Sequence, residues 1–160
     1  MHVSERKRNP FTGSAAGGRA LSALQLPFFL LRPPSGFGVL TTTGRRTGKT
    51  RRRCIRAIRG DGKAYIVAIK GTRTAWAKNI RANPGLRLRI RGGTFAGVAR
   101  ELRGTAETQH AKEAYCETVN PSDYLAYTLW RKGRPTAAKI KELHRSWFEK
   151  GGPLVVELRE

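Results

Sequence analysis

Alternating apolar and polar residues predict two β-hairpins in the middle of the chain. In the clearer one, leucine and isoleucine at 86, 88 and 90 alternate with arginine at 87, 89 and 91, so one side of the strand faces a core and the other faces water. Gly92-Gly93 then turns the chain into a returning strand over residues 94–103. In the other hairpin, the turn Gly60-Asp61-Gly62 joins strands over residues 52–59 and 63–69.

The same pattern predicts two further strands, over residues 37–43 and 153–159. Helical spacing is found in five segments, at residues 19–31, 74–82, 105–119, 122–130 and 136–150. Six mostly antiparallel strands with helices packed on them favour an α+β fold built on a small barrel. Residues 1–18 are basic and then rich in Gly, Ser and Ala, which predicts a disordered tail, so residues 19–160 form a single domain with an N-terminal helix.

The charge of the chain points to a polyanionic neighbour. The 32 Lys and Arg residues exceed the 11 Asp and Glu residues and give a formal net charge of +21. Nucleic acid, an anionic membrane, or a ligand rich in phosphate and carboxylate would balance such a charge. The densest run lies around a glycine turn and contains Arg45, Arg46, Lys49, Arg51, Arg52 and Arg53. Like charges at this density are tolerated only in water or opposite an anion.

Two familiar kinds of site are excluded. Gly48-Lys49-Thr50 has the ending of a P-loop, but that signature needs four residues between its glycines, and Gly44 and Gly48 enclose only three. A strand rather than a helix is also predicted to follow. Two distant cysteines, Cys54 and Cys116, and three scattered histidines form no metal-ligand pattern. Such cysteines are typical of reduced thiols in a cytoplasmic protein.

The apolar stretch at residues 20–31 is too short to span a membrane. Because basic residues flank it, it can either pack across an open end of the barrel or lie on an anionic membrane surface. Nucleic acid is a weaker alternative as a partner. The arginine-bearing face at residues 87–91 carries no aromatic side chains on which bases could stack.

Several segments resemble the deazaflavin-dependent nitroreductase and quinone reductase family. The run from Gly38 to Arg51 is similar to that family's TTTGR[KR][ST]GxxR signature. Ala68-Ile69-Lys70-Gly71 is similar to its A-S-K-G turn, and the segment from Trp76 to Pro84 to its W-x-x-N-L-x-A-N-P helix. The segments Asn120–Tyr124 and Pro153–Glu157 resemble its later motifs, so the likeness covers residues 36–130 and the last strand.

This resemblance implies a split β-barrel, similar to the FMN-binding split barrels, that binds coenzyme F-420, an 8-hydroxy-5-deazaflavin, in preference to FMN. The reduced coenzyme would deliver a hydride to a small-molecule acceptor: a nitroaromatic, a quinone or another activated alkene. Two alternatives stay open, namely non-catalytic binding of a flavin-like cofactor and a basic nucleic-acid-binding module.

The resemblance also implies which residues hold the coenzyme. F-420 carries a phosphodiester and an oligoglutamate tail, to which arginines can make bidentate contacts. The expected cofactor-binding residues are Arg45, Arg46, Thr47, Gly48, Arg51, Lys70, Gly71, Trp76 and Asn79. The Thr47 hydroxyl and the Gly48 amide are expected to complete an anion nest. Trp76 and Asn79 are expected to wall the pocket, although Trp76 fits core packing equally well.

Two tyrosines, Tyr124 and Tyr127, are the candidate proton donors, with surface or packing roles as the alternative. Ile69 stands where the family usually has serine, which leaves the donor on the acceptor side open. A quinone acceptor would suit a cytoplasmic protein in peripheral contact with the inner face of a membrane through residues 19–32. The sequence leaves the oligomeric state open, a homodimer included.

Overall fold

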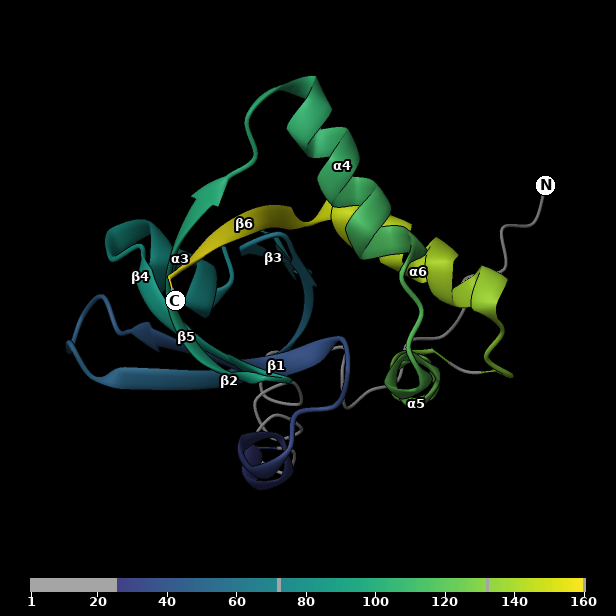
Figure 1. Ribbon diagram of the computed structural model, residues 1–160, viewed down its shortest axis with the longest axis horizontal. Coiled ribbons are helices and arrows are strands. Elements are labelled where there is room, and N and C mark those ends of the chain that lie inside the picture. Colours follow the sequence, from purple (N-terminus) through teal and green to yellow (C-terminus); the bar gives the residue numbers. More distant parts are fainter. Residues whose placement is uncertain (1–25, 72, 132, 160) are drawn as a thin grey trace.

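Six strands form a closed ring in the computed structural model, which describes residues 26–71, 73–131 and 133–159 (Figure 1). The strands are β1 (Phe37–Thr43), β2 (Thr50–Gly60), β3 (Lys63–Ala68), β4 (Gly85–Ile90), β5 (Gly93–Glu101) and β6 (Gly152–Arg159). Around the barrel they follow the order β1-β2-β3-β6-β5-β4, and every neighbouring pair is antiparallel. The predicted six-stranded, antiparallel α+β barrel is therefore confirmed.

Both predicted hairpins form, and their turns use glycine where the backbone requires a positive φ. Gly62 has a φ of 65° in the β2–β3 turn, and Gly92 has a φ of 103° in the β4–β5 turn. On β4, Leu86, Leu88 and Ile90 are buried inside the barrel, whereas the arginines between them face outward. The predicted alternation of leucine inside and arginine outside is thus confirmed.

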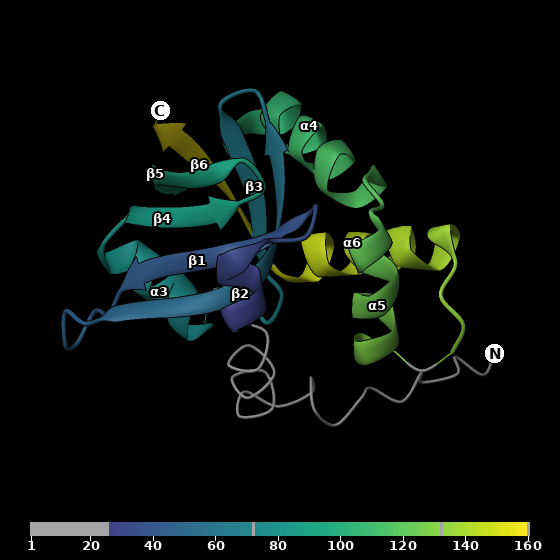
Figure 2. The same ribbon diagram turned by 60° about the horizontal axis from the view of Figure 1, so that its bottom comes forward.

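The interior of the barrel is an aliphatic core that a short helix closes at one end. Helix α3 (Ala75–Ala82) contributes Trp76, Ala77 and Ile80 to the same buried cluster as Leu40 and the inward residues of the other strands. Thr74 and Asn83 flank this helix, close to the bounds that the sequence predicts. Figure 2 shows α3 beside the barrel at the end where the β1–β2 loop projects.

Three helices cover one outer face of the barrel. Helices α4 (Gly104–Glu117), α5 (Pro121–Trp130) and α6 (Ala137–Lys150) each lie within two residues of their predicted bounds. They pack on outward side chains of β2, β3 and β6, including Ile58, Tyr65 and Val155, and so form a second hydrophobic core. Among the described residues, the outer face of β1, β4 and β5 carries no comparable helical layer and is contacted only by the turn at residues 26–31 (Figure 1).

The predicted N-terminal helix is described only over residues 26–31, which are helical. This turn is held against β1 and β4, because the Arg89 side chain donates a hydrogen bond of 2.9 Å to the Leu30 carbonyl and the Phe29 ring meets Phe37 edge-on. The remainder of the predicted helix, from residue 19, and the predicted tail at residues 1–18 lie outside the described residues.

Candidate functional site

The loop between β1 and β2 is closed by its own hydrogen bonds. The Gly44 amide donates to the Lys49 carbonyl at 2.7 Å, and the Gly48 amide donates to the Gly44 carbonyl at 2.9 Å. The Thr47 hydroxyl accepts a hydrogen bond from the Lys49 amide at 3.3 Å. The Gly48 amide, expected from the sequence to face an anion, is therefore engaged within the loop, and its φ of 69° lets the chain turn. The hydroxyl hydrogen of Thr47 remains able to donate to a ligand.

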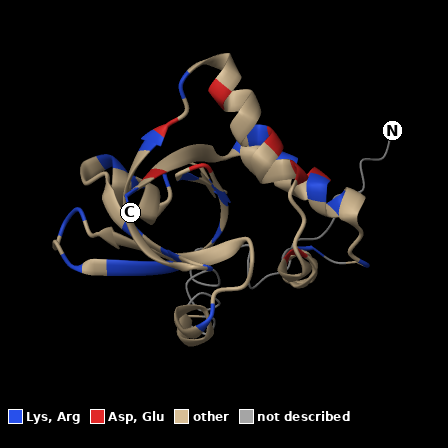
Figure 3. Ribbon diagram, in the orientation of Figure 1, with Lys and Arg blue, Asp and Glu red and all other residues tan. Residues whose placement is uncertain are grey.

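Cationic side chains project from this closed loop into solvent. Arg45, Arg46, Lys49 and Arg51 are all exposed, and none forms an ion pair with a carboxylate of the described residues. The Arg51 side chain lies over Gly44, where an added Cβ would be 3.6 Å from the arginine Nε. Figure 3 shows blue and no red on the whole β1–β2 hairpin. This end of the barrel is accordingly a concentrated, uncompensated positive charge.

Asn79 connects this loop to helix α3. Its Oδ1 accepts two hydrogen bonds from Arg45, one from the backbone amide at 3.2 Å and one from the guanidinium Nη1 at 3.1 Å. Its Nδ2 lies 3.5 Å from the Thr42 hydroxyl, and the side chain is buried. Asn79 thus contacts the loop from α3 and holds both the backbone and the guanidinium of Arg45 in place. The structure brings together these two residues of the expected cofactor site.

The turn carrying Lys70 and Gly71 leads directly from β3 into α3. Gly71 has a φ of 85°, and its carbonyl accepts a hydrogen bond of 2.6 Å from the Thr74 hydroxyl. Lys70 is exposed. Trp76, a few residues later, is buried among the side chains of the barrel core. This matches the core-packing role, one of the two roles that the sequence analysis considered for it. Through α3, this turn and the cationic loop share one end of the barrel.

The structure does not bring the two candidate tyrosines to this end. Tyr127 is only 2% exposed and lies in the core under the helices, whereas Tyr124 is 38% exposed and lines a shallow groove of about 690 Å³ beside α6. Their helix, α5, contacts the start of β1, where the Ser122 hydroxyl donates to the Ser35 carbonyl at 2.7 Å. The cationic loop follows the far end of β1, six residue steps or about 20 Å away. Their assignment as proton donors stays a prediction.

A groove on the uncovered face of the barrel was not anticipated from the sequence. It has a volume of about 690 Å³ and runs along the outer surface of β1, β2, β4 and β5, next to the cationic loop. Four arginines line it, and no Asp or Glu does: Arg52, Arg87, Arg89 and Arg159. Its other lining residues are mostly small or carry hydroxyls, such as Thr41, Thr43, Gly85 and Ala96. The sequence signals for it were the alternating arginines of β4 and Arg52 of the dense cationic run.

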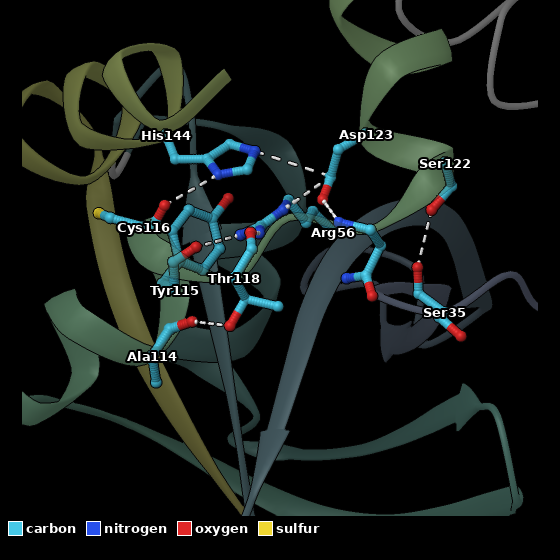
Figure 4. Close-up of polar contacts among 10 residues, drawn as sticks. Ser35, Arg56, Ala114, Tyr115, Cys116, Thr118, Ser122, Asp123 and His144 are labelled. Carbon is cyan, nitrogen blue, oxygen red and sulfur yellow. Dashed lines mark hydrogen bonds and ion pairs between the residues drawn. The ribbon is translucent and has the colours of Figure 1, made fainter. Parts of the chain in front are cut away.

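A buried ion pair under the helical layer was also missed. Arg56 of β2 and Asp123 of α5 are 2% and 1% exposed, and the Nε and Oδ1 atoms are 3.1 Å apart (Figure 4). The same guanidinium donates to the carbonyls of Tyr115 and Thr118 at 2.6 and 2.7 Å, and it stacks over the Tyr115 ring. A single arginine therefore joins β2 to two helices.

His144 of α6 completes this cluster. Its Nε2 lies 3.6 Å from Asp123 Oδ1, and its Nδ1 lies 3.3 Å from the Cys116 carbonyl oxygen. Burial alone would raise the pKa of Asp123, but hydrogen bonds from His144 and the Asn120 amide and the charge of Arg56 lower that pKa overall. Burial raises the pKa of the Cys116 thiol to about 11, so this cysteine is a packing residue and not a thiolate nucleophile.

Residues 32–134 match the sequence model of the F420H(2)-dependent quinone reductase family. The chain belongs to this family. It is accordingly an F-420-dependent oxidoreductase, and its cofactor is coenzyme F-420. The expected family and cofactor are confirmed, and in the part of the chain that is described no helix is long and apolar enough to cross a membrane.

Solved structures with the same fold support the split-barrel assignment. One, described as an F420-H2 dependent reductase (FDR-A), is 22% identical, with a TM-score of 0.51 over 78% of this chain and 95% of that one. Another, described as a domain-swapped dimer, is also 22% identical, with a TM-score of 0.52 over 79% and 81%. A heme binding protein from Mycobacterium smegmatis is 13% identical, with a TM-score of 0.51 over 79% and 47%. A reductase and a heme binding protein thus share one fold, so the function has to be argued from the site rather than from the barrel.

The described residues fit a polyanionic coenzyme. The loop presents four exposed cations, and the adjoining groove presents four more without an acidic side chain among its lining residues. Guanidinium groups suit both phosphate and carboxylate oxygens, because their planar N–H donors form paired hydrogen bonds with either group.

Proposed function

We propose that this protein transfers a hydride from reduced F-420 to a small electron acceptor, a quinone, a nitroaromatic or another activated alkene. The observation that carries the proposal is the cation-rich end of the barrel, where the loop of residues 44–49 adjoins the arginine-lined groove. We place the phosphodiester of the coenzyme at this loop. Family membership supports the hydride chemistry, and the acceptor class is our own proposal.

When bound, F-420 supplies a two-electron hydride donor. The residues of this chain contribute binding and orientation. Arg45, Arg46 and Arg51 would hold the phosphodiester through charge-assisted hydrogen bonds, and Asn79 would keep Arg45 in place for that contact. Because the loop is already closed by its own hydrogen bonds, little further ordering is needed when the ligand binds. Accurate placement of the donor is the main requirement of a hydride transfer.

The proton that completes the reduction needs a separate source. The groove is open to water, which can provide it directly. We retain Tyr124 and Tyr127 as proposed donors for an acceptor that reaches α5. A Tyr124→Phe variant should then lower kcat with little change in KM, while an unchanged kcat would assign proton delivery to water.

The decisive test of the enzyme proposal uses purified full-length protein. It is mixed with reduced F-420 and a panel of quinones and nitro compounds, and reoxidation is followed at the absorbance of the deazaflavin. Turnover with at least one acceptor is expected. Tight binding of F-420 without turnover on any acceptor would favour a non-catalytic carrier. A parallel fluorescence titration with FMN should show weaker binding, because FMN lacks the oligoglutamate tail.

We also propose peripheral contact with an anionic membrane. Phe28 and Leu31 are 73% and 81% exposed on the helical turn at residues 26–31, next to the exposed Arg32. Apolar side chains beside cations are typical of surfaces that bind the lipid interface. Replacing both residues by serine should reduce sedimentation with anionic liposomes, whereas Leu125→Ser, at a residue 65% exposed on α5, should not. Equal sedimentation of all three proteins would refute the contact.

A further inference from the structure

The C-terminal end of α4 is closed by side chains from two other elements. The last carbonyls of a helix have no partner inside the helix, and they form the negative end of its dipole. At this end the Arg56 guanidinium of β2 donates to the carbonyls of Tyr115 and Thr118 (Figure 4). The carbonyl oxygen of Cys116, between them, lies 3.3 Å from Nδ1 of His144 on α6. A buried histidine therefore lies beside a permanent cation at the same helix end.

The second ring nitrogen of His144 also faces an oxygen atom. Its Nε2 lies 3.6 Å from Oδ1 of Asp123, the carboxylate that is paired with Arg56. Carbonyl and carboxylate oxygens only accept hydrogen bonds. A neutral imidazole has a single N–H, so one of its nitrogens would direct a lone pair at one of these oxygens. An imidazolium has two N–H groups and can donate to both oxygens.

The groups that can carry charge around this ring come from four elements: Arg56 of β2, Tyr115, Cys116 and Glu117 of α4, Asp123 of α5, and Lys141 and Arg145 of α6 itself. Burial raises the pKa of the Tyr115 phenol to about 12 and that of the Cys116 thiol to about 11, so both are neutral near pH 7. Lys141 and Arg145 are each bound to Glu117, at 3.2 Å.

The strands beneath α6 leave this description unchanged. Strands β3 and β6 contribute Tyr65, Val67 and Val155 to the core under the helices. Of these, Tyr65 can ionise, and its ring meets the exposed His110 of α4 edge-on, at 6.1 Å between ring centroids. Among the groups named, His144 is therefore the one whose charge changes near neutral pH, because the charge of a histidine ordinarily changes between about pH 5 and 8.

The carboxylate that faces His144 also holds the start of α5. Its Oδ2 accepts a hydrogen bond of 2.7 Å from the Asn120 amide, in the capping box of this helix. Its Oδ1 is 3.1 Å from Arg56 Nε, so one side chain of α5 joins the helix to β2 and α6. A proton gained by His144 adds a donor at the point where α4, α5 and α6 meet.

We propose that His144 is a proton-controlled link between the three helices of the covering layer. With two N–H groups, its ring donates both to the Cys116 carbonyl and to the Asp123 carboxylate, and so ties α6 to the end of α4 and the start of α5. When the ring loses one proton, it keeps one donor and α5 is held less tightly. The link involves no residue of the cationic loop, so its failure would leave the proposed function intact.

The direct test observes the ring nitrogens of His144 in full-length protein labelled with nitrogen-15. Long-range correlation of ring hydrogens and nitrogens, recorded from about pH 5 to about pH 9, distinguishes one protonated nitrogen from two. His144→Gln assigns the signals. We expect two protonated nitrogens at the acidic end of the range and one at the basic end. One protonated nitrogen throughout would overturn the proposal, and two throughout would make His144 a permanent cap and overturn its control by protons.

Hydrogen exchange of the α5 amides tests the consequence for the helical layer. Glutamine is uncharged and cannot reach both acceptors at once, so His144→Gln imitates the neutral ring at every pH. At about pH 5.5, its α5 amides should exchange roughly tenfold faster than those of wild-type protein, since a hydrogen bond to a charged group is lost. At about pH 8.5 the two proteins should exchange at similar rates. Comparison at one pH removes the intrinsic effect of pH on exchange.

His110→Gln is the matched control, because His110 is exposed on α4 and its charge should not affect α5. This variant should exchange like wild-type protein at both pH values. Faster exchange in His144→Gln by the same factor at both pH values would show that His144 only packs between the helices, and would overturn the proposal. An equal pH-dependent loss in His110→Gln would assign the effect to general charge and overturn it as well.

Discussion

Arginine is buried and ion-paired on one outer face of the barrel but exposed on the other, and β2 contributes residues to both faces. Arg52 and Arg56 lie on the same face of this strand, four residues apart. Arg56 is sealed beneath α4 and α5 and paired with Asp123, whereas Arg52 lines an open groove without a carboxylate partner in the described chain. The covering layer, rather than the residue type, decides whether a guanidinium is paired inside the fold or stays exposed to solvent.

The distribution of acidic residues produces this difference. Six of the acids lie on the helical layer, at Glu107, Glu113, Glu117, Asp123, Glu142 and Glu149. Residues 37–60, which form the β1–β2 hairpin, contain no acid at all (Figure 3). Every ion pair within the described residues involves an acid on this helical layer or the neighbouring Glu157. Within the described residues, ion pairs therefore form on the helical face, whereas the β1–β2 hairpin has no acidic residue to neutralise its charge.

The largest expected effect comes from removing the buried carboxylate that neutralises Arg56. Asp123→Ala leaves the buried Arg56 guanidinium without its counter-charge, so the free energy of unfolding should fall by about 3–5 kcal/mol. Urea denaturation followed by circular dichroism measures this loss. Glu149→Gln removes an acid from an exposed pair with Lys112 and should cost at most about 1 kcal/mol. A similar cost for both variants would show that burial does not distinguish the two faces.

The next effect concerns the open face and changes binding more than stability. Arg51→Ala removes a cation beside Gly44 at the proposed phosphodiester site. A hydrogen bond to a charged group is worth about 1.5–3 kcal/mol, so the Kd for F-420 should rise at least tenfold, from a wild-type value in the micromolar range or tighter. Fluorescence titration measures it. Arg134→Ala is the control. An equal loss of affinity in that variant would show that the effect of Arg51→Ala reflects net charge alone.

A smaller effect should appear in the pH dependence of stability on the covered face. The pKa of Glu107 is lowered from 4.5 to about 2, chiefly because Arg100 donates two hydrogen bonds to the carboxylate. A carboxyl group with a lowered pKa in the folded state adds stability above its unfolded pKa, and this contribution disappears as the pH falls toward 2. The unfolding free energy of wild-type protein should therefore fall more steeply between pH 4.5 and pH 2 than that of Glu107→Gln.

Denaturant titrations at several pH values supply both slopes for this comparison. Glu113→Gln, on the same helix but outside the ion pairs of the described residues, is the matched control for loss of a carboxyl group. Identical slopes for Glu107→Gln and wild-type protein would contradict the prediction.

The smallest effect tests the conformation of the loop. Gly48 has a φ of 69°, and an added Cβ would contact nothing within 4 Å, so Gly48→Ala introduces only backbone strain of about 1 kcal/mol. If the loop binds F-420 in this conformation, the Kd should rise up to about fivefold. Gly62→Ala carries the same kind of strain in the β2–β3 turn, at a φ of 65°, and should leave the Kd unchanged. Equal Kd values for both variants would mean that the loop binds in another conformation.

Local chemistry explains why so much of the fold could be predicted from the sequence. Residues 86–91 reveal their inward and outward sides because the period of a strand is two, and glycine pairs mark the hairpin turns. Asn83-Pro84 likewise marks the end of α3. The five-segment resemblance identified the family because its motifs occur in a fixed order. Each of these signals is carried by neighbouring residues.

The features that could not be predicted from the sequence depend on contacts between residues that are distant along the chain. Arg56 follows shortly after the dense cationic run that ends at Arg53, and only the docking of α4 and α5 over β2 shows that it is buried. That Arg52, Arg87 and Arg159 lie side by side on one face follows from the register of five strands, which no local sequence pattern specifies. The separation of Tyr124 from the cationic loop follows from where α5 docks, and the sequence spacing carries no information on it.

The closed strand ring limits how this protein can associate with other chains. Each of the six strands has antiparallel neighbours on both sides, although the β2–β3 register covers only Ala57–Gly60, so most of the described barrel edges are already paired. A partner therefore finds mainly side chains, rather than main-chain groups, on most of this surface. Closure of the ring thus lets a strongly basic barrel surface coexist with a limited opportunity for strand addition.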